Sequence, residues 1–91
     1  MYIVRSRGAG VFFAEIVKRN GNEVELANAR RLHYWDGAAS LSQLAMEGVK
    51  KPNKCRFTMA VDSCIVMEVV EIIPCSPSAV ENINAVPIWK I

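Results

Sequence analysis

Alternating apolar and polar residues predict β-strands in the first third of the chain. Tyr2–Ser6 and Val11–Lys18 are strand candidates separated by a glycine-rich break. In Glu23–Leu26, two glutamates alternate with valine and leucine, as in a strand with one buried face. The Asn20-Gly21 pair precedes that segment, and Asn-Gly tolerates the positive φ angles of tight hairpin turns. We therefore predict a β-hairpin here.

The next segment, Arg30–Trp35, is predicted to be another strand or an extended approach to a helix. Side chains in a strand alternate between its two faces. With that period, Leu32 and Tyr34 share one side, and Arg31, His33 and Trp35 share the other. The second side is unusual because it combines basic and aromatic groups.

Apolar residues spaced three and four apart then predict a helix with one buried stripe. The stripe comprises Leu41, Leu44, Ala45 and Val49. Asp36 or a nearby residue is expected to cap its N-terminus, because a side-chain oxygen can accept the unpaired backbone N–H groups of the first turn. Gly48 is expected to end it.

Two further strands are predicted after an exposed loop at Lys50–Lys54. They are Phe57–Val61 and Ile65–Ile73, with a turn at Asp62 and Ser63.

The C-terminal part begins with Ser76 and Pro77, a pair typical of a helix cap and the first helical position. This predicts a short helix over Pro77–Ala85. The final Ile88–Ile91 segment is apolar, and we expect it to dock on the core or on a neighbouring subunit.

Together these elements predict one α+β domain over residues 1–91. We expect a strongly bent antiparallel sheet or a small open barrel, with one central helix and a short C-terminal helix. Strands do not alternate regularly with crossover helices, which argues against a parallel α/β fold. A domain this small leaves much of its surface exposed, so we also expect a homo-oligomer.

Composition narrows the function classes. The chain is 52% hydrophobic and 22% charged, with a formal net charge of +2, which disfavours a general nucleic-acid-binding protein. Its three cysteines lack Cys-x-x-Cys spacing, which argues against a disulfide framework. The sequence shows neither a secretory signal nor a membrane-spanning segment. These features lead us to expect a cytoplasmic protein.

Signatures of catalysis are missing from the sequence. It contains no GxxxxGK[ST] phosphate loop, no HExxH pair and no GxSxG elbow. A single histidine cannot form a multi-histidine metal site. His33, Asp36 and Ser40 contain groups able to relay a proton, but their spacing is not that of a catalytic triad. We therefore expect no metal, no cofactor and no enzyme activity.

Binding is a better interpretation of the segment from Ala29 to Gly48. Aromatic rings offer a flat face to a base or sugar, arginine pairs with phosphate or carboxylate, and the start of a helix favours an anion. The candidate ligand-binding residues are Arg30, Arg31, His33, Tyr34, Trp35, Asp36, Ala38 and Ser40. A structural role stays open as the alternative, in which the aromatic residues anchor the core, Arg31 pairs with Asp36, and Ser40 or Ser42 satisfies the helix start.

Three segments also carry a resemblance to a known family. They are Ala-Arg-Arg-Leu-His-Tyr-Trp-Asp-Gly-Ala-Ala-Ser-Leu-Ser-Gln-Leu-Ala at positions 29–45, Glu71–Cys75 and Val86–Ile91. With them the chain resembles small phage and prophage proteins that contain a domain of unknown function. The resemblance transfers no catalytic residue. It implies the host cytoplasm as the location and favours a compact protein that binds a host molecule, including counter-defence by sequestering a nucleotide immune signal.

Three hypotheses follow for the function. The first is a non-enzymatic, oligomeric protein that captures a small anionic, nucleotide-like ligand near Arg31, Trp35 and Ala38. The second is a protein-interaction module that inhibits a host enzyme through its aromatic and basic surface. The third is a small enzyme acting on a nucleotide, for which His33 and Asp36 are the residues to test.

Overall fold

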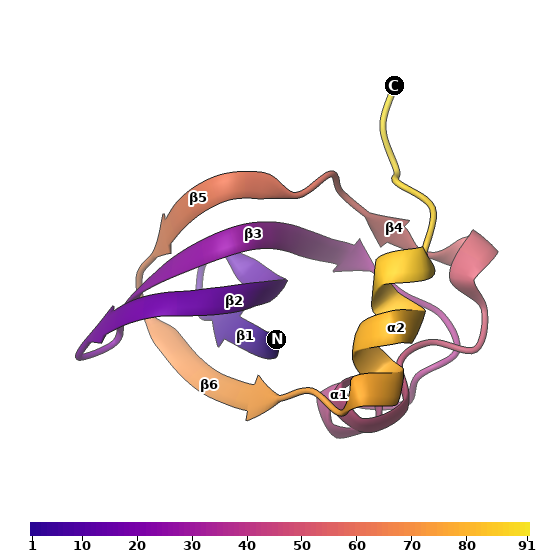
Figure 1. Ribbon diagram of the computed structural model, residues 1–91, viewed down its shortest axis with the longest axis horizontal. Coiled ribbons are helices and arrows are strands. Elements are labelled where there is room, and N and C mark those ends of the chain that lie inside the picture. The colour runs from indigo at the N-terminus through magenta and orange to yellow at the C-terminus, as the bar shows by residue number, and fades with distance from the viewer.

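Six antiparallel strands form one sheet in the computed structural model, which covers residues 1–91 (Figure 1). They are β1 (Tyr2–Ser6), β2 (Gly10–Asn20), β3 (Glu23–Tyr34), β4 (Arg56–Phe57), β5 (Val61–Val66) and β6 (Val69–Pro74). The order across the sheet is β4-β3-β2-β1-β6. β5 lies on the same side of β3 as β4, because β4 pairs with Leu32 and Tyr34 while β5 pairs with Val24–Ala29.

The sheet is strongly bent and does not close. Only Met67 and Glu68 separate β5 from β6, although these two strands lie at opposite edges of the sheet. The bend brings the edges near each other, and the backbone N–H of Val69 donates to the carbonyl of Asn22 in the β2–β3 turn at 2.9 Å. Register shifts in β2 and β3 accompany this curvature, as expected of β-bulges.

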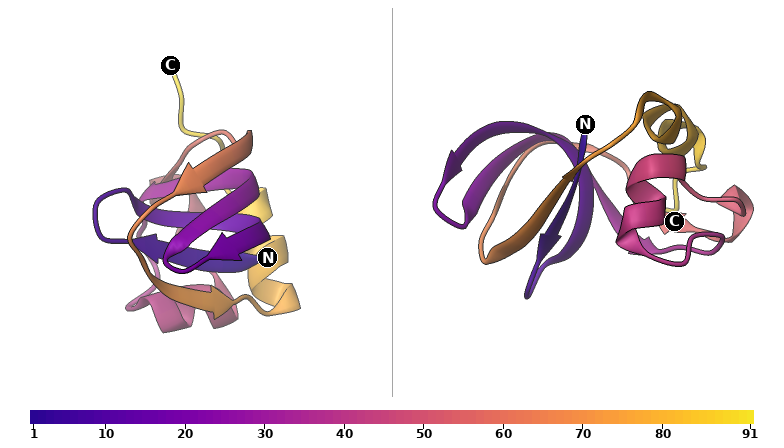
Figure 2. Two further views of the ribbon diagram at one scale, coloured as in Figure 1. Left: turned by 90° about the vertical axis from the view of Figure 1, so that its left-hand side faces the viewer. Right: turned by 90° about the horizontal axis from the view of Figure 1, so that it is seen from below.

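Two helices lie together at one end of the bent sheet (Figure 2). They are α1 (Leu41–Glu47) and α2 (Pro77–Ala85), and a single 3₁₀ turn, η1, spans Pro52–Lys54. The side chains of Ser40 and Ser76 cap α1 and α2 by accepting backbone N–H groups of the first turns. Neither helix has the length and apolar character needed to cross a membrane.

Two hydrophobic clusters lie on opposite faces of β1 and β2. The helix-side cluster consists of Ile3, Phe13, Leu32, Leu44, Ala45, Val49, Phe57, Ile83 and Val86. The strand-side cluster consists of Val4, Phe12, Ala14, Val24, Leu26, Ala29 and Val66. Val69 and Ile72 of β6 pack against the strand-side cluster, which also contains Val66 of β5, so this cluster occupies the inside of the bend.

The predicted α+β class is confirmed, with a bent antiparallel sheet and a C-terminal helix over the predicted residues. The Arg30–Trp35 segment is not a separate strand, because β3 continues from Glu23 through Tyr34. Of the residues expected to cap α1, Asp36 does not do so, and the alternative that Ser40 satisfies the helix start is confirmed.

The predicted turn at Asp62 and Ser63 is wrong. Both residues lie within β5, where their polar side chains are exposed at an edge of the sheet. The chain reverses at Met67 and Glu68 instead, and Glu68 has a positive φ of 56°. The sequence carries no turn-forming pair at that point, because neither methionine nor glutamate is typical of a positive-φ position.

Candidate functional site

Strand β3 separates the residues of the predicted binding segment onto two faces. Arg30 is opposite Phe13 in the pairing with β2, and it points toward the helices together with Leu32. Arg31 is opposite Phe12, and both Arg31 and His33 are exposed on the other face. The basic side chains of this segment therefore do not act as one group.

Arg30 is buried and lies between the sheet and the end of α2. Its guanidinium donates to five backbone carbonyls: those of Thr58 (2.8 Å), Ile83 (2.7 Å), Val86 (2.7 Å), Pro87 (3.1 Å) and Phe57 (3.4 Å). Burial lowers the pKa of Arg30 from its ordinary value, and Cys55 acts in the opposite direction. An arginine keeps its charge under such a shift. The structure thus uses Arg30 to tie the C-terminal segment to β3 and β4.

The residues after Tyr34 lie close to the core and to the start of α1. Trp35 and Ala38 are half-buried and pack against the helix-side cluster. Asp36 forms an ion pair with Lys51, with a separation of 3.8 Å between Nζ and Oδ1. Ser40 accepts the backbone N–H of Gln43 at 3.1 Å. These side chains have structural partners.

Side chains occupy part of the hydrogen-bonding capacity at the start of α1. The Gln43 side-chain oxygen accepts the backbone N–H of Ala39 at 2.7 Å, and this bond complements the cap by Ser40. The helix is only seven residues long, so its dipole is small.

Four exposed residues, which we call the basic face, are Arg31, His33, Arg56 and Trp89. The rings of His33 and Trp89 stack with centroids 5.2 Å apart and planes 9° apart. The guanidinium carbon of Arg56 lies 5.6 Å from the Trp89 ring centroid. Arg31 is two residues before His33 and therefore on the same face of β3. Its guanidinium carbon lies 4.8 Å from the ring centroid of Phe12.

Neither arginine of the basic face has an acidic partner. The only ion pair in the molecule joins Lys51 to Asp36. The backbone N–H of Arg31 donates to Oγ1 of Thr58 at 3.1 Å, which fixes the strand beneath the guanidinium. The guanidinium groups of Arg31 and Arg56 therefore present uncompensated charge.

An apolar hollow opens beside Arg31. Its volume is about 210 Å³, and it is lined by Phe12, Ala29, Arg31, Thr58, Met59, Val61 and Cys64. This is smaller than a site for a whole drug-sized ligand, which has about 300 Å³ or more. The hollow fits the apolar part of a ligand whose charged part lies on the basic face.

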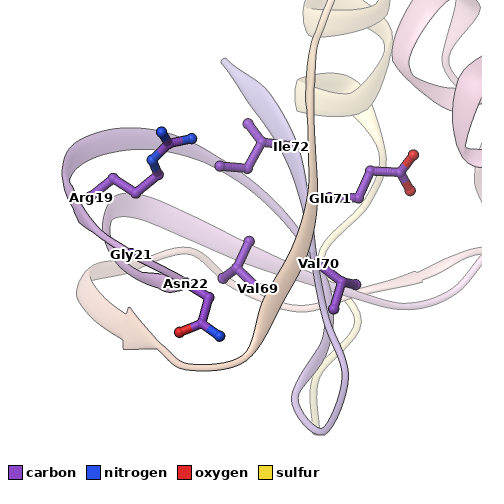
Figure 3. A pocket seen from close by; sticks show the side chains of 7 residues that line it. All are labelled: Arg19, Gly21, Asn22, Val69, Val70, Glu71 and Ile72. Carbon is purple, nitrogen blue, oxygen red and sulfur yellow. The ribbon is translucent and has the colours of Figure 1, made fainter.

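A second hollow, of about 250 Å³, lies between the β2–β3 turn and β6 (Figure 3). It is lined by Arg19, Gly21, Asn22, Val69, Val70, Glu71 and Ile72. Figure 3 shows the Arg19 side chain directed toward Ile72, while Glu71 points away to the other side of β6. No aromatic ring lines this hollow, so it lacks the combination of aromatic rings and arginines found at the basic face.

Arg56 and Trp89 are missing from the candidate ligand-binding residues named from the sequence. The signals are nevertheless present, because Arg56 follows a group of lysines and Trp89 lies in the apolar C-terminal segment. What places them beside His33 is long-range pairing: β4 pairs with the end of β3, and the Trp89 backbone N–H donates to the Phe57 carbonyl at 2.8 Å.

The possible metal ligands and the cysteines do not form a cluster. The chain has no cluster of three His, Cys, Asp or Glu side chains able to hold a metal ion. All three cysteines are free and half-buried. Burial raises the pKa of the Cys75 thiol, so that this cysteine stays protonated at neutral pH.

Comparison with known proteins gives a family and no function. No curated protein and no solved structure matches the chain. One family model matches residues 1–83, which include β1 to β6 and most of α2, while Trp89 lies beyond the matched range. The chain therefore belongs to the family described as a domain of unknown function (DUF6948).

Proposed function

We propose that this protein binds, without chemical change, a small anionic ligand of nucleotide-like character on the basic face. The observation that carries the proposal is that neither exposed guanidinium group, Arg31 or Arg56, has an acidic partner, while Arg56 lies over the Trp89 ring that stacks on His33. Arginine makes paired, charge-assisted hydrogen bonds with phosphate. Two arginines on one face suit an anion that offers several phosphate oxygens as hydrogen-bond acceptors.

The proposed pose assigns separate tasks to the basic face and the hollow. Arg31 borders the hollow, so a base or other ring entering it would leave its phosphate within reach of Arg31 and His33. Trp89 contacts both His33 and Arg56. We assign it the role of holding these two side chains in place. Arg30, Trp35 and Ala38 support the site from the core side without touching the ligand.

A binding role fits these residues better than catalysis. The acidic side chain closest to His33 in sequence, Asp36, is paired with Lys51, and Ser40 is engaged as a helix cap. His33 itself stacks on Trp89. No nucleophile and base are therefore arranged as a pair on the basic face. The resemblance to small phage and prophage proteins supports sequestration of a nucleotide immune signal as the biological role.

Isothermal titration calorimetry against cyclic nucleotides and ADP-ribose-type nucleotides tests the proposal. We expect binding to weaken as salt rises and to weaken about tenfold or more in Arg31→Ala and Arg56→Ala, because each loses charge-assisted hydrogen bonds. Arg19→Ala is the matched control, since Arg19 is an exposed arginine at the other hollow. Its affinity should equal that of the unmodified protein.

The ligand recovered after denaturation should be chemically unchanged. A folded protein that binds none of the probes would refute the proposal. An equal loss in Arg19→Ala would show that the basic face is not the site, and conversion of the nucleotide to a product would favour an enzyme.

A further inference from the structure

The sheet has three strand edges. At two of them, other features of the chain hinder pairing with a further strand. The outer edge of β4 is occupied by the C-terminal segment, where Ile88 forms a parallel bridge with Phe57. The β6 edge carries the charged Glu71 and ends at Pro74, and the N–H of Val69 is already bonded within the molecule. Charge, proline and coverage are the usual means of preventing edge pairing.

The third edge, β5, is paired on one side only and lacks the proline and the covering segment that protect the other two edges. Its sequence is Val-Asp-Ser-Cys-Ile-Val, with no proline, lysine or arginine and with Asp62 as its one charge. It pairs only with β3, so alternate residues direct their N–H and C=O groups away from the sheet. Val61 and Ile65 are exposed on it, and the exposed Met59 and Met67 flank it.

We propose that two copies of this chain associate by antiparallel pairing of β5 with β5 across a two-fold axis. A symmetric contact requires a surface that is complementary to itself. With the axis at Ser63, Val61 of each copy is opposite Ile65 of the other, and Asp62 is opposite Cys64. The two exposed apolar residues of the strand thus meet each other, and the two carboxylates do not face one another.

Charge disfavours a nucleic acid or an acidic peptide as the occupant, and the self-complementary pairing of Val61 with Ile65 favours a second copy. The β5 edge carries one negative charge and no positive charge, whereas the arginines of the basic face lie on β3 and β4. Pairing would join the two sheets into one and cover apolar side chains that a 91-residue domain has too little core to bury. This inference does not depend on the proposed ligand.

Sedimentation velocity over a dilution series tests it in the full chain. We expect a reversible dimer whose dissociation constant rises about tenfold or more in Ile65→Lys, because each copy then places a lysine opposite the apolar Val61 of the other. Val17→Lys on β2 and Val70→Lys on β6 are matched controls, since these valines are exposed by 59% and 53% and Ile65 by 59%. Both controls should remain dimeric, with circular dichroism confirming that each variant is folded.

Hydrogen exchange of the unmodified protein provides a second readout that needs no variant. The outward N–H groups of β5 should be protected at high protein concentration and exchange rapidly at low concentration. A monomer at all concentrations would overturn the inference. So would a dimer that Val70→Lys disrupts and Ile65→Lys does not, or concentration-dependent protection located in β6 and absent from β5.

Discussion

Arg30 and Arg31 are neighbours in the sequence that the strand directs into opposite environments. Arg30 is buried, and its hydrogen bonds all go to backbone carbonyls, two of which, those of Val86 and Pro87, follow the end of α2. Arg31 is exposed and has the ring of Phe12 beneath it. The first residue therefore contributes to the fold, and the second is available to bind.

Replacing Arg30 by methionine should lower the free energy of unfolding by about 3 kcal/mol. The methionine fills part of the space but leaves several buried carbonyls without their donor, at about 1–3 kcal/mol for each group left unsatisfied. Arg31→Met is the matched control, and its cost should stay below about 1 kcal/mol because only an exposed cation–π contact is lost. Urea denaturation measures both. Equal losses would show that the carbonyl contacts of Arg30 do not stabilise the fold.

The sequence could identify this arginine pair as important but could not assign the two roles. Strand alternation correctly predicts that neighbouring residues point to opposite faces. It cannot tell which face the helices cover, because the carbonyls around Arg30 come from positions 57, 58, 83, 86 and 87. The basic face depends on the same kind of long-range contact, since Trp89 reaches His33 only after the chain has folded.

At the scale of elements, α1 and α2 are joined by the side chain of Asn82. Its Oδ1 accepts the backbone N–H of Val49 at 2.8 Å, and its Nδ2 donates to the Val49 carbonyl at 2.9 Å. Gly48 permits this contact. It ends α1 with φ 77° and ψ −151°, and a Cβ there would overlap the Asn82 amide.

Gly48→Ala should therefore destabilise the protein by about 3 kcal/mol. Two costs add together: the backbone conformation is accessible almost only to glycine, and the Asn82 side chain is displaced. Gly21→Ala in the β2–β3 turn is the control. That glycine also has a positive φ, 64°, but nothing lies where its Cβ would be, so its cost should be about 1 kcal/mol. Thermal unfolding of both variants measures the difference. Similar losses would mean that backbone strain alone, and not the contact between helices, determines the effect.

Local signals explain which elements could be predicted. Ser76 and Pro77 define the start of α2, and Gly21 supplies the positive φ of the Gly21-Asn22 turn between β2 and β3, so the local sequence predicts both features in the right place. The β5–β6 turn has no such signal. Its reversal is fixed by tertiary contacts, including the bond from the Arg7 N–H to the Glu68 carbonyl at 3.0 Å.

The molecule as a whole has two hydrophobic clusters that share the same strands. Phe12 and Phe13 are consecutive in β2 and belong to different clusters, as do Ile3 and Val4 in β1. Both clusters depend on the position of β1 and β2, because each strand contributes side chains to both. The two clusters should therefore unfold together despite lying on opposite faces of the sheet.

A variant in one cluster, observed from the other, tests this coupling. Trp35 packs against the helix-side cluster, and in a Trp89→Phe background it is the only tryptophan. Phe12→Leu removes volume from the strand-side cluster, at a cost of about 1 kcal/mol, which lowers the melting temperature of a domain this size by about 5 °C. We expect Trp35 fluorescence and far-UV circular dichroism to report the same lowered midpoint. A Trp35 midpoint that stays unchanged while the circular-dichroism midpoint falls would mean that the helix-side cluster is stable on its own and that β2 does not couple the two.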